Sequence, residues 1–271
     1  MPTISASISV LRLLLICFAV LSLSACATRP ATSGWGGGAS LTPGWGKVGD
    51  AFVAAATDPF TWAPAAGALV LGVSGADKDV SRWARRHTPV YGSRGNASDA
   101  SDLLREISFG GYLLTGLAAP VGAGENPVVD KVKGFGVGFA AIAATELITR
   151  QGKAAIGRER PLDQNDQSLP SRHTSLTAVS ARLTRETLRY YDMPRGARIA
   201  ADAGLAGMTA MTGWARVEAG VHYPSDVLAG AALGNFLAVF ATEAFLHPES
   251  GLALRVDPME DGLAVTASIA F

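Results

Sequence analysis

Four long apolar stretches, most of them interrupted by charge, are the feature that most constrains how this chain folds. They cover residues 107–119, 134–148, 197–213 and 227–246. The charged side chains inside them are Glu146, Arg198, Asp202 and Glu243. A charge at the centre of a bilayer costs about 2.5–3.5 kcal/mol. We therefore expect a buried all-α bundle, in which the stretches 107–119 and 227–246 could still contact lipid.

The overall charge excludes one class of function. The chain has 271 residues, with 23 Lys and Arg against 23 Asp and Glu, so its formal net charge is zero. A nucleic-acid-binding protein carries an excess of basic residues. We therefore expect no nucleic-acid partner.

The N-terminus has the pattern of an export signal. Arg12 precedes a short apolar run, residues 13–23, which ends in Leu23-Ser24-Ala25-Cys26. A bilayer-spanning helix needs about 20 apolar residues, so the run is short for a span. Small residues before a cysteine resemble a bacterial lipobox, which implies a signal peptide over residues 1–25 and lipidation of Cys26. The alternatives are an uncleaved anchor, or an ordinary signal beside an incidental cysteine.

Cysteine usage agrees with export of a lipidated protein. Cys17 lies inside the signal, so the mature chain would keep Cys26 alone, without a disulfide or a thiol-based metal site. Ala27 follows the cysteine, and by the same resemblance this favours the outer membrane. We expect a lipid-anchored protein of the bacterial cell envelope that faces the periplasm.

Composition divides the rest of the chain into three parts. Residues 26–47 are rich in Gly, Ser, Thr and Pro and predict a flexible tether. Residues 48–247 form the predicted helical domain, in which Asp58-Pro59 is a typical helix start. Residues 248–271 alternate apolar and polar positions around Asp261-Gly262, which predicts a short β-hairpin.

The first segment with chemical potential is Lys153-Ala-Ala-Ile-Gly-Arg-Glu-Arg160-Pro161. Lys153 and Arg160 are seven residues apart, which is two helical turns, so both cations could face one cavity. Pro161 should end the helix and place Arg160 at a rim. Taken alone, the pattern is better explained by two surface cations.

The second segment is Pro170-Ser171-Arg172-His173, followed by a helical run to about Tyr190. Proline and serine are typical of a helix start, with Ser171 as the N-cap. The free amides of a helix start bind anions. A histidine beside them can donate a proton to a departing oxygen, although a capping motif with an incidental histidine has the same sequence.

The third segment runs from Arg216 through His222 to Asp226. Pro224 should open the last long helix and place Asp226 in its first turn. A carboxylate four residues after a histidine can orient one ring nitrogen and leave the other free to attack. By itself, such a His–Asp pair is common.

Together, the three segments resemble the signature motifs of the type 2 phosphatidic acid phosphatase superfamily. The order is Lys-x6-Arg-Pro, then Pro-Ser-x-His, then Arg-x5-His-x3-Asp, between Lys153 and Asp226. Vanadium haloperoxidases share this signature. The resemblance implies an all-α helical bundle of this type, and a phosphatase that needs neither a metal nor a cofactor.

The resemblance also implies a role for each motif residue. His222 would attack phosphorus, Asp226 would orient it, and His173 would protonate the leaving oxygen. The residues that would bind the phosphate are Lys153, Arg160, Ser171, Arg172 and Arg216.

Two positions depart from the family pattern. Arg172 stands where the family has glycine, and Ala215 stands where it has serine before Arg216. A negative φ at Arg172 would keep its amide available, and its guanidinium would either contact phosphate or point to solvent. Neither change removes a nucleophile or a proton donor.

These observations favour hydrolysis of a phosphomonoester or a pyrophosphate. A lipid substrate fits the membrane anchor and the apolar helices, and a small soluble phosphate ester is the next choice. Two alternatives are a non-catalytic envelope lipoprotein, supported by Arg172 and Ala215, and a vanadate-dependent haloperoxidase, which needs the same residues.

Overall fold

The computed structural model describes residues 34–121, 126–162, 165–246, 252–259 and 262–269. The predicted signal peptide, Cys17, Cys26 and the first part of the predicted tether lie outside the described residues.

The described residues form a helical bundle followed by one strand pair, as predicted. Its elements are α2 (Trp45–Thr57), α3 (Pro59–Ser74), α4 (Ala76–His87), α5 (Arg94–Ala118), α6 (Pro127–Ile156), α7 (Arg172–Leu188), α8 (Arg195–Glu218), α9 (Pro224–Ala241), a π-helical turn η1 (Thr242–Leu246), β1 (Leu252–Met259) and β2 (Gly262–Ile269).

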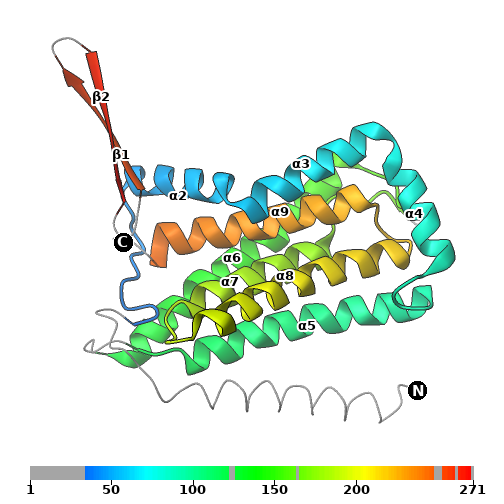
Figure 1. The fold of residues 1–271 in the computed structure, drawn as a ribbon, viewed down its shortest axis with the longest axis horizontal. Coiled ribbons are helices and arrows are strands. Elements are labelled where there is room, and N and C mark those ends of the chain that lie inside the picture. Colours follow the sequence, from blue (N-terminus) through cyan, green and yellow to red (C-terminus); the bar gives the residue numbers. More distant parts are fainter. Residues whose placement is uncertain (1–33, 122–125, 163–164, 247–251, 260–261, 270–271) are drawn as a thin grey trace.

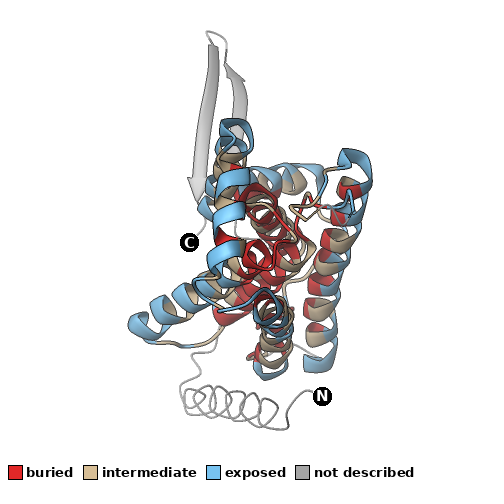
Figure 2. Ribbon diagram, turned by 90° about the vertical axis from the view of Figure 1, so that its right-hand side faces the viewer, coloured by how far each residue is buried: buried red, intermediate tan, exposed pale blue. Residues whose placement is uncertain are grey.

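Helix α7 is the centre of the bundle. It packs against α5, α6, α8 and α9, while α3 covers the outer side of α9 (Figure 1). Most of its side chains from Thr174 to Leu188 are buried, and buried residues concentrate in the interior of the bundle (Figure 2). All four predicted apolar stretches lie within helices, so the helical expectation is confirmed.

Short polar side chains start several of these helices. Asp58 accepts the backbone N–H of Phe60 at 2.9 Å at the start of α3, as its sequence predicts. Asn126 caps α6 by accepting the N–H of Val129. At the other end of α6, Gly157 takes a left-handed conformation (φ 59°) that favours glycine and stops the helix.

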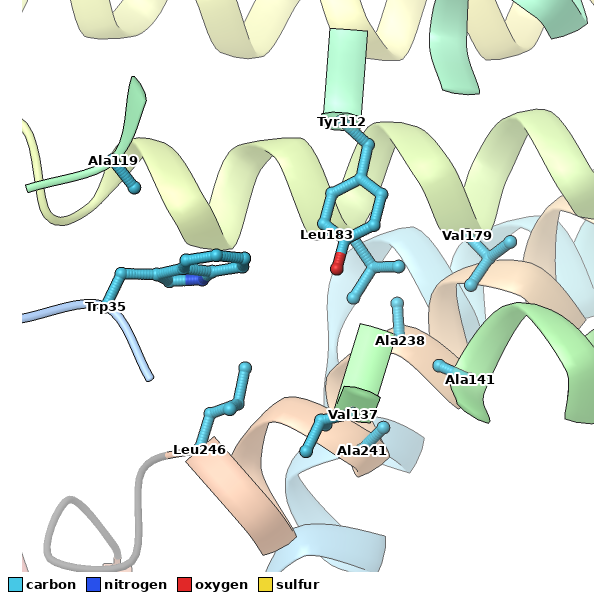
Figure 3. Packing of buried hydrophobic residues seen from close by; sticks show 10 residues of the cluster. All are labelled: Trp35, Tyr112, Ala119, Val137, Ala141, Val179, Leu183, Ala238, Ala241 and Leu246. Atoms are coloured by element: carbon cyan, nitrogen blue, oxygen red, sulfur yellow. The ribbon is translucent and has the colours of Figure 1, made fainter. Parts of the chain in front are cut away.

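The N-terminal segment differs from the tether expected for residues 26–47. Trp35 is only 1% exposed, and its ring packs edge-on against Phe135 at 4.9 Å between centroids. Figure 3 shows the indole within the core cluster that also contains Tyr112 and Leu183. Gly36 has φ +84°, and a Cβ there would lie 1.9 Å from the carbonyl oxygen of Asp130. From residue 34 onward this segment is therefore part of the domain.

The C-terminal strands pair as the alternating pattern predicts. β1 and β2 are antiparallel, with Val256 opposite Val265. The pair lies beside the N-terminal end of α2 and extends away from the helices (Figure 1). Asp261 of the predicted turn lies outside the described residues.

Among the described residues, two helical segments are long and apolar enough to cross a membrane by length and composition. They are Pro127–Ile156, whose apolar window is 33% buried, and Pro224–Leu246, whose window is 56% buried. The second packs against α3, α6 and α7, so protein covers much of its surface.

Candidate active site

The three sequence motifs meet at one end of the bundle. The last turn of α6, the first turn of α7 and the last turn of α8 converge there, beside the loop that leads into α9. They surround a cavity of about 440 Å³ lined by Arg150, Lys153, Ala154, Arg160, Gln167, Arg172, His173, Arg216 and His222. Six of the eight predicted catalytic and phosphate-binding residues therefore face one space, and Ser171 and Asp226 lie behind it.

Both cations of the first motif reach the cavity, but the prediction that one helix carries Lys153 and Arg160 was wrong. Helix α6 ends at Ile156, so only Lys153 lies on a helix. Arg160 follows in the loop, where its backbone N–H donates to Asn165 O at 3.0 Å. The loop after α6, and not a continued helix, therefore brings Arg160 to the cavity that Lys153 lines.

Two arginine donors beside the cavity are buried and unpaired. Within the described residues, Arg160 Nε and Arg216 Nε have no hydrogen-bond partner. Buried polar groups in proteins are almost always hydrogen-bonded, and charged donors without acceptors are costly. Their presence around one cavity indicates a site built for an anion.

The cations of the site lie close enough to lower one another's pKa. Lys153 is 8% exposed, and burial together with the Arg160 charge lowers its pKa to about 8. Burial also lowers the pKa of Arg216 to about 10. A bound phosphate would relieve both effects. We call Lys153, Arg160 and Arg216 the phosphate cradle.

His222 lies in the loop between α8 and α9 and is 1% exposed. Burial, with the charges of Lys153 and Arg216, lowers its pKa to about 4, so the ring is neutral near pH 7. Its Nδ1 is 3.7 Å from Asp226 Oδ2, which is longer than a hydrogen bond. Contacts of this kind often tighten only when substrate binds. The carboxylate lies on the Nδ1 side, which leaves Nε2 for the substrate.

A polar network holds Asp226 in place. Its Oδ2 accepts Ser168 Oγ–H at 2.5 Å and Tyr223 N–H at 2.8 Å, and its Oδ1 accepts Arg158 Nη1 at 2.7 Å. Arg158 also donates to Asp77 at 2.7 Å. Burial by itself raises the pKa of Asp226, but these hydrogen bonds and the Arg158 charge outweigh it, and the pKa is lowered.

His173 lies on the first turn of α7 and has a carboxylate of its own. Its Nε2 is 2.8 Å from Asp102 Oδ1 on α5. Burial, followed by the Arg216 charge, lowers the pKa of His173 to about 4. The phosphate cradle therefore shares its cavity with two imidazoles, each with an aspartate beside it.

Arg172 forms an ion pair on the wall of the cavity. Its Nε donates to both oxygens of Glu146, at 2.8 and 2.7 Å. Its φ is negative, as it is for every non-glycine residue in the described part of the chain except Thr88. The amide geometry of the helix start therefore survives the replacement of glycine. The other departure, Ala215, is fully buried.

Ser171 links the starts of two helices behind the cavity. It is fully buried, its N–H donates to Asp226 O at 3.0 Å, and its Oγ accepts Thr174 Oγ1–H at 3.0 Å. Its side chain makes no capping bond to α7. Ser171 thus joins the start of α7 to the start of α9, just behind the two catalytic candidates.

Sequence reasoning missed the residues that hold the histidines. Arg158, Asp77 and Asp102 belong to this set, and they come from the loop after α6, from α4 and from α5. Of these three, only Arg158 could have been identified from the sequence, since it lies inside the first motif. In the described residues, no group of three His, Cys, Asp or Glu side chains is arranged to hold a metal ion.

Comparison with known proteins agrees with this geometry. Residues 145–247 match the family model described as the PAP2 superfamily, and this range contains all three motifs. Among curated proteins, none matches the chain significantly.

A solved structure has a similar fold. It is described as the first transmembrane PAP2 type phosphatidylglycerolphosphate phosphatase, from Bacillus subtilis. The TM-score is 0.50 and the identity 19%, with 72% of this chain and 94% of that chain covered. At this identity the likeness concerns the fold. The resemblance read from the motifs is confirmed.

Proposed function

We propose that this chain, whose residues 145–247 carry a PAP2 superfamily domain, is a metal-independent phosphatase that acts on a phosphorylated lipid. The observation that carries the proposal is the cavity that His173 and His222 line together with the unpaired Nε donors of Arg160 and Arg216. A binding site alone would explain the cations. It would not explain two neutral imidazoles, each beside a carboxylate.

The first half of the proposed reaction transfers the phosphoryl group to the enzyme. The Nε2 lone pair of His222 attacks phosphorus while the bond to the leaving oxygen breaks. Because Nδ1 then becomes positively charged, Asp226 stabilises the product. The phosphate cradle holds the non-bridging oxygens and neutralises their charge, which is the largest contribution in most phosphoryl transfers.

His173 supplies the proton for the leaving oxygen. Burial, followed by the Arg216 charge, lowers its pKa to about 4. A bound phosphate offsets that charge, so substrate binding raises the pKa and loads the ring with a proton. In the second half, His173 takes a proton from water, the water attacks phosphorus, and the P–N bond breaks to release phosphate and restore His222.

The lipid substrate and the cellular location belong to the same proposal. The apolar helical segments Pro127–Ile156 and Pro224–Leu246, together with the lipobox-like sequence before Cys26, support a membrane-associated protein. Lipidation of Cys26 would hold the site near its substrate. We propose an anchored enzyme of the cell envelope, on the periplasmic side of the outer membrane.

Phosphate release from p-nitrophenyl phosphate, with and without EDTA, tests the reaction class. Wild-type protein should turn over in both conditions. His222→Ala should abolish turnover, and His173→Ala should lower it by roughly 10²–10⁴-fold. Turnover that disappears in EDTA would contradict the metal-free mechanism. Failure of the wild type on soluble and lipid phosphates alike would make the protein a non-catalytic lipoprotein.

A further inference from the structure

The cavity contains two cations that the phosphate cradle does not use. Arg150 and Arg172 both line it, and both donate Nε to Glu146, at 2.6 Å from Arg150 and at 2.7–2.8 Å from Arg172. One carboxylate thus fixes two guanidinium groups side by side. We call Arg150, Glu146 and Arg172 the rim triad.

The rim triad keeps donors available. In the described part of the chain, the Nη groups of both arginines make no hydrogen bond, since each contact with Glu146 uses Nε. Two positive charges and one negative charge leave the triad with a net charge of about +1. Arginine presents its N–H groups as a planar fork that matches phosphate oxygens.

The rim triad is also shallower than the phosphate cradle. The side chains of Arg150 and Arg172 are 70% and 40% exposed, whereas Lys153 and Arg216 are 8% and 7% exposed as residues. The cavity of about 440 Å³ has the volume of roughly 15 liquid water molecules, which is more than one phosphate group needs. A second anionic group has room above the first.

The sequence position of Arg172 fixes where that second group would lie. Arg172 directly precedes His173, and both line the cavity. His173 serves the leaving oxygen in the proposed reaction. In a diphosphate, that oxygen bridges to the second phosphorus, so the second phosphate must lie beside His173, where the rim triad is.

We propose that the rim triad is a second phosphate subsite and that the substrate is a diphosphate monoester. The terminal phosphate occupies the cradle and transfers to His222, and the ester-side phosphate binds Arg172 and Arg150. The P–O bond to the bridging oxygen breaks, and the organic phosphomonoester departs with the proton from His173. This inference rests on the proposed phosphatase function.

Two substrates with the same tail test the subsite. Farnesyl diphosphate and farnesyl phosphate in detergent differ by one phosphate, so the ratio of their kcat/KM values isolates its contribution. We expect the wild type to prefer the diphosphate by about tenfold or more. Losing charge-assisted hydrogen bonds to one arginine should lower the diphosphate value by about 10–100-fold in Arg172→Gln. The monophosphate value should fall much less.

A second variant and an exposed control complete the design. Arg150→Gln should reduce the same ratio, and Arg172→Gly, which restores the family residue, should do so as well. Arg82→Gln removes an exposed arginine that pairs with Asp79 outside the cavity, and it should leave the ratio unchanged. Inorganic pyrophosphate and inorganic phosphate as competitive inhibitors give an independent readout, because only the pyrophosphate Ki should rise strongly in Arg172→Gln.

The outcomes separate the two proposals. Equal losses for both substrates in the arginine variants, or a wild type without preference for the diphosphate, would overturn the subsite and leave the phosphatase intact. A wild type that hydrolyses neither substrate would overturn the proposed function and the subsite together.

Discussion

Replacing Arg158 should both destabilise the fold and slow catalysis. Its guanidinium joins two buried carboxylates, Asp226 (0% exposed) and Asp77 (3% exposed), at 2.7 Å each. Removing one member of a buried ion pair typically costs about 3–5 kcal/mol, because the remaining charge is left unpaired. Arg158 is 25% exposed and both aspartates keep other donors, so we expect Arg158→Ala to cost about 3 kcal/mol.

The catalytic effect should follow from the freed Asp226. Without Arg158, its carboxylate can turn away from His222, so kcat should fall by roughly 10–100-fold, since each 1.4 kcal/mol of lost stabilisation is tenfold in rate. Chemical denaturation gives the stability change, and phosphate release gives kcat. Arg82→Gln, with its exposed pair to Asp79, is the control and should cost under about 1 kcal/mol.

A double-mutant cycle makes this prediction sharper. Asp77→Ala alone removes one partner, and Arg158→Ala combined with Asp77→Ala should cost clearly less than the sum of the single variants. A loss below about 1 kcal/mol in Arg158→Ala, or strict additivity in the cycle, would refute the view that this network holds the nucleophile's carboxylate.

Three further predictions concern the buried Trp35, the pH dependence of catalysis and the Asp102 that contacts the proposed proton donor His173. Trp35→Ala should lower the free energy of unfolding by about 3–5 kcal/mol in chemical denaturation, since the indole is 1% exposed. A change near zero would instead support the predicted flexible tether. With p-nitrophenyl phosphate, whose leaving group needs little help from the His173 proton, the pH profile of kcat/KM should have an acid limb near 4, below which His222 is protonated, and an alkaline limb near 8, above which Lys153 is neutral. Lys153→Arg should move the alkaline limb upward, and an unmoved limb would assign it to another group. Asp102→Asn should slow alkyl phosphates, which need the His173 proton, more than p-nitrophenyl phosphate, whereas equal slowing would argue for a purely structural Asp102.

Much of the helical domain could be predicted because its signals are local. The apolar stretches have helical length, Asp58-Pro59 starts α3 as expected, and Pro224 opens α9 with Asp226 in its first turn. These features depend on neighbours a few residues away in the sequence, and tertiary packing agrees with them.

Trp35 shows where local reasoning fails. Its segment is rich in glycine, and composition favours a tether. The indole is buried because Gly116 and Gly134 leave a slot between α5 and α6, where an added Cβ would lie 3.0 Å from the ring. Two glycines some 80 and 100 residues away leave no mark on the sequence around Trp35.

The candidate site likewise contains residues that the sequence predicts and residues that only the fold reveals. All but Arg150 and Gln167 of the residues that line the cavity belong to recognisable motifs. The sequence therefore predicted Lys153, Arg160, Arg172, His173, Arg216 and His222 together. Their supports, among them Asp77 and Asp102, are single charged residues on helices that precede the motifs. Such residues are usually solvated, and only the fold brings them to the histidines.

The central claim is that His222 carries the phosphoryl group, and trapping the intermediate tests it most directly. His173→Ala should accept phosphate from p-nitrophenyl phosphate, whose leaving group needs little acid assistance, but should hydrolyse the intermediate slowly. After an alkaline quench, mass spectrometry of the peptides should find an acid-labile phosphate on His222. An enzyme that turns over while residue 222 stays unmodified, or that carries the phosphate elsewhere, would contradict the account.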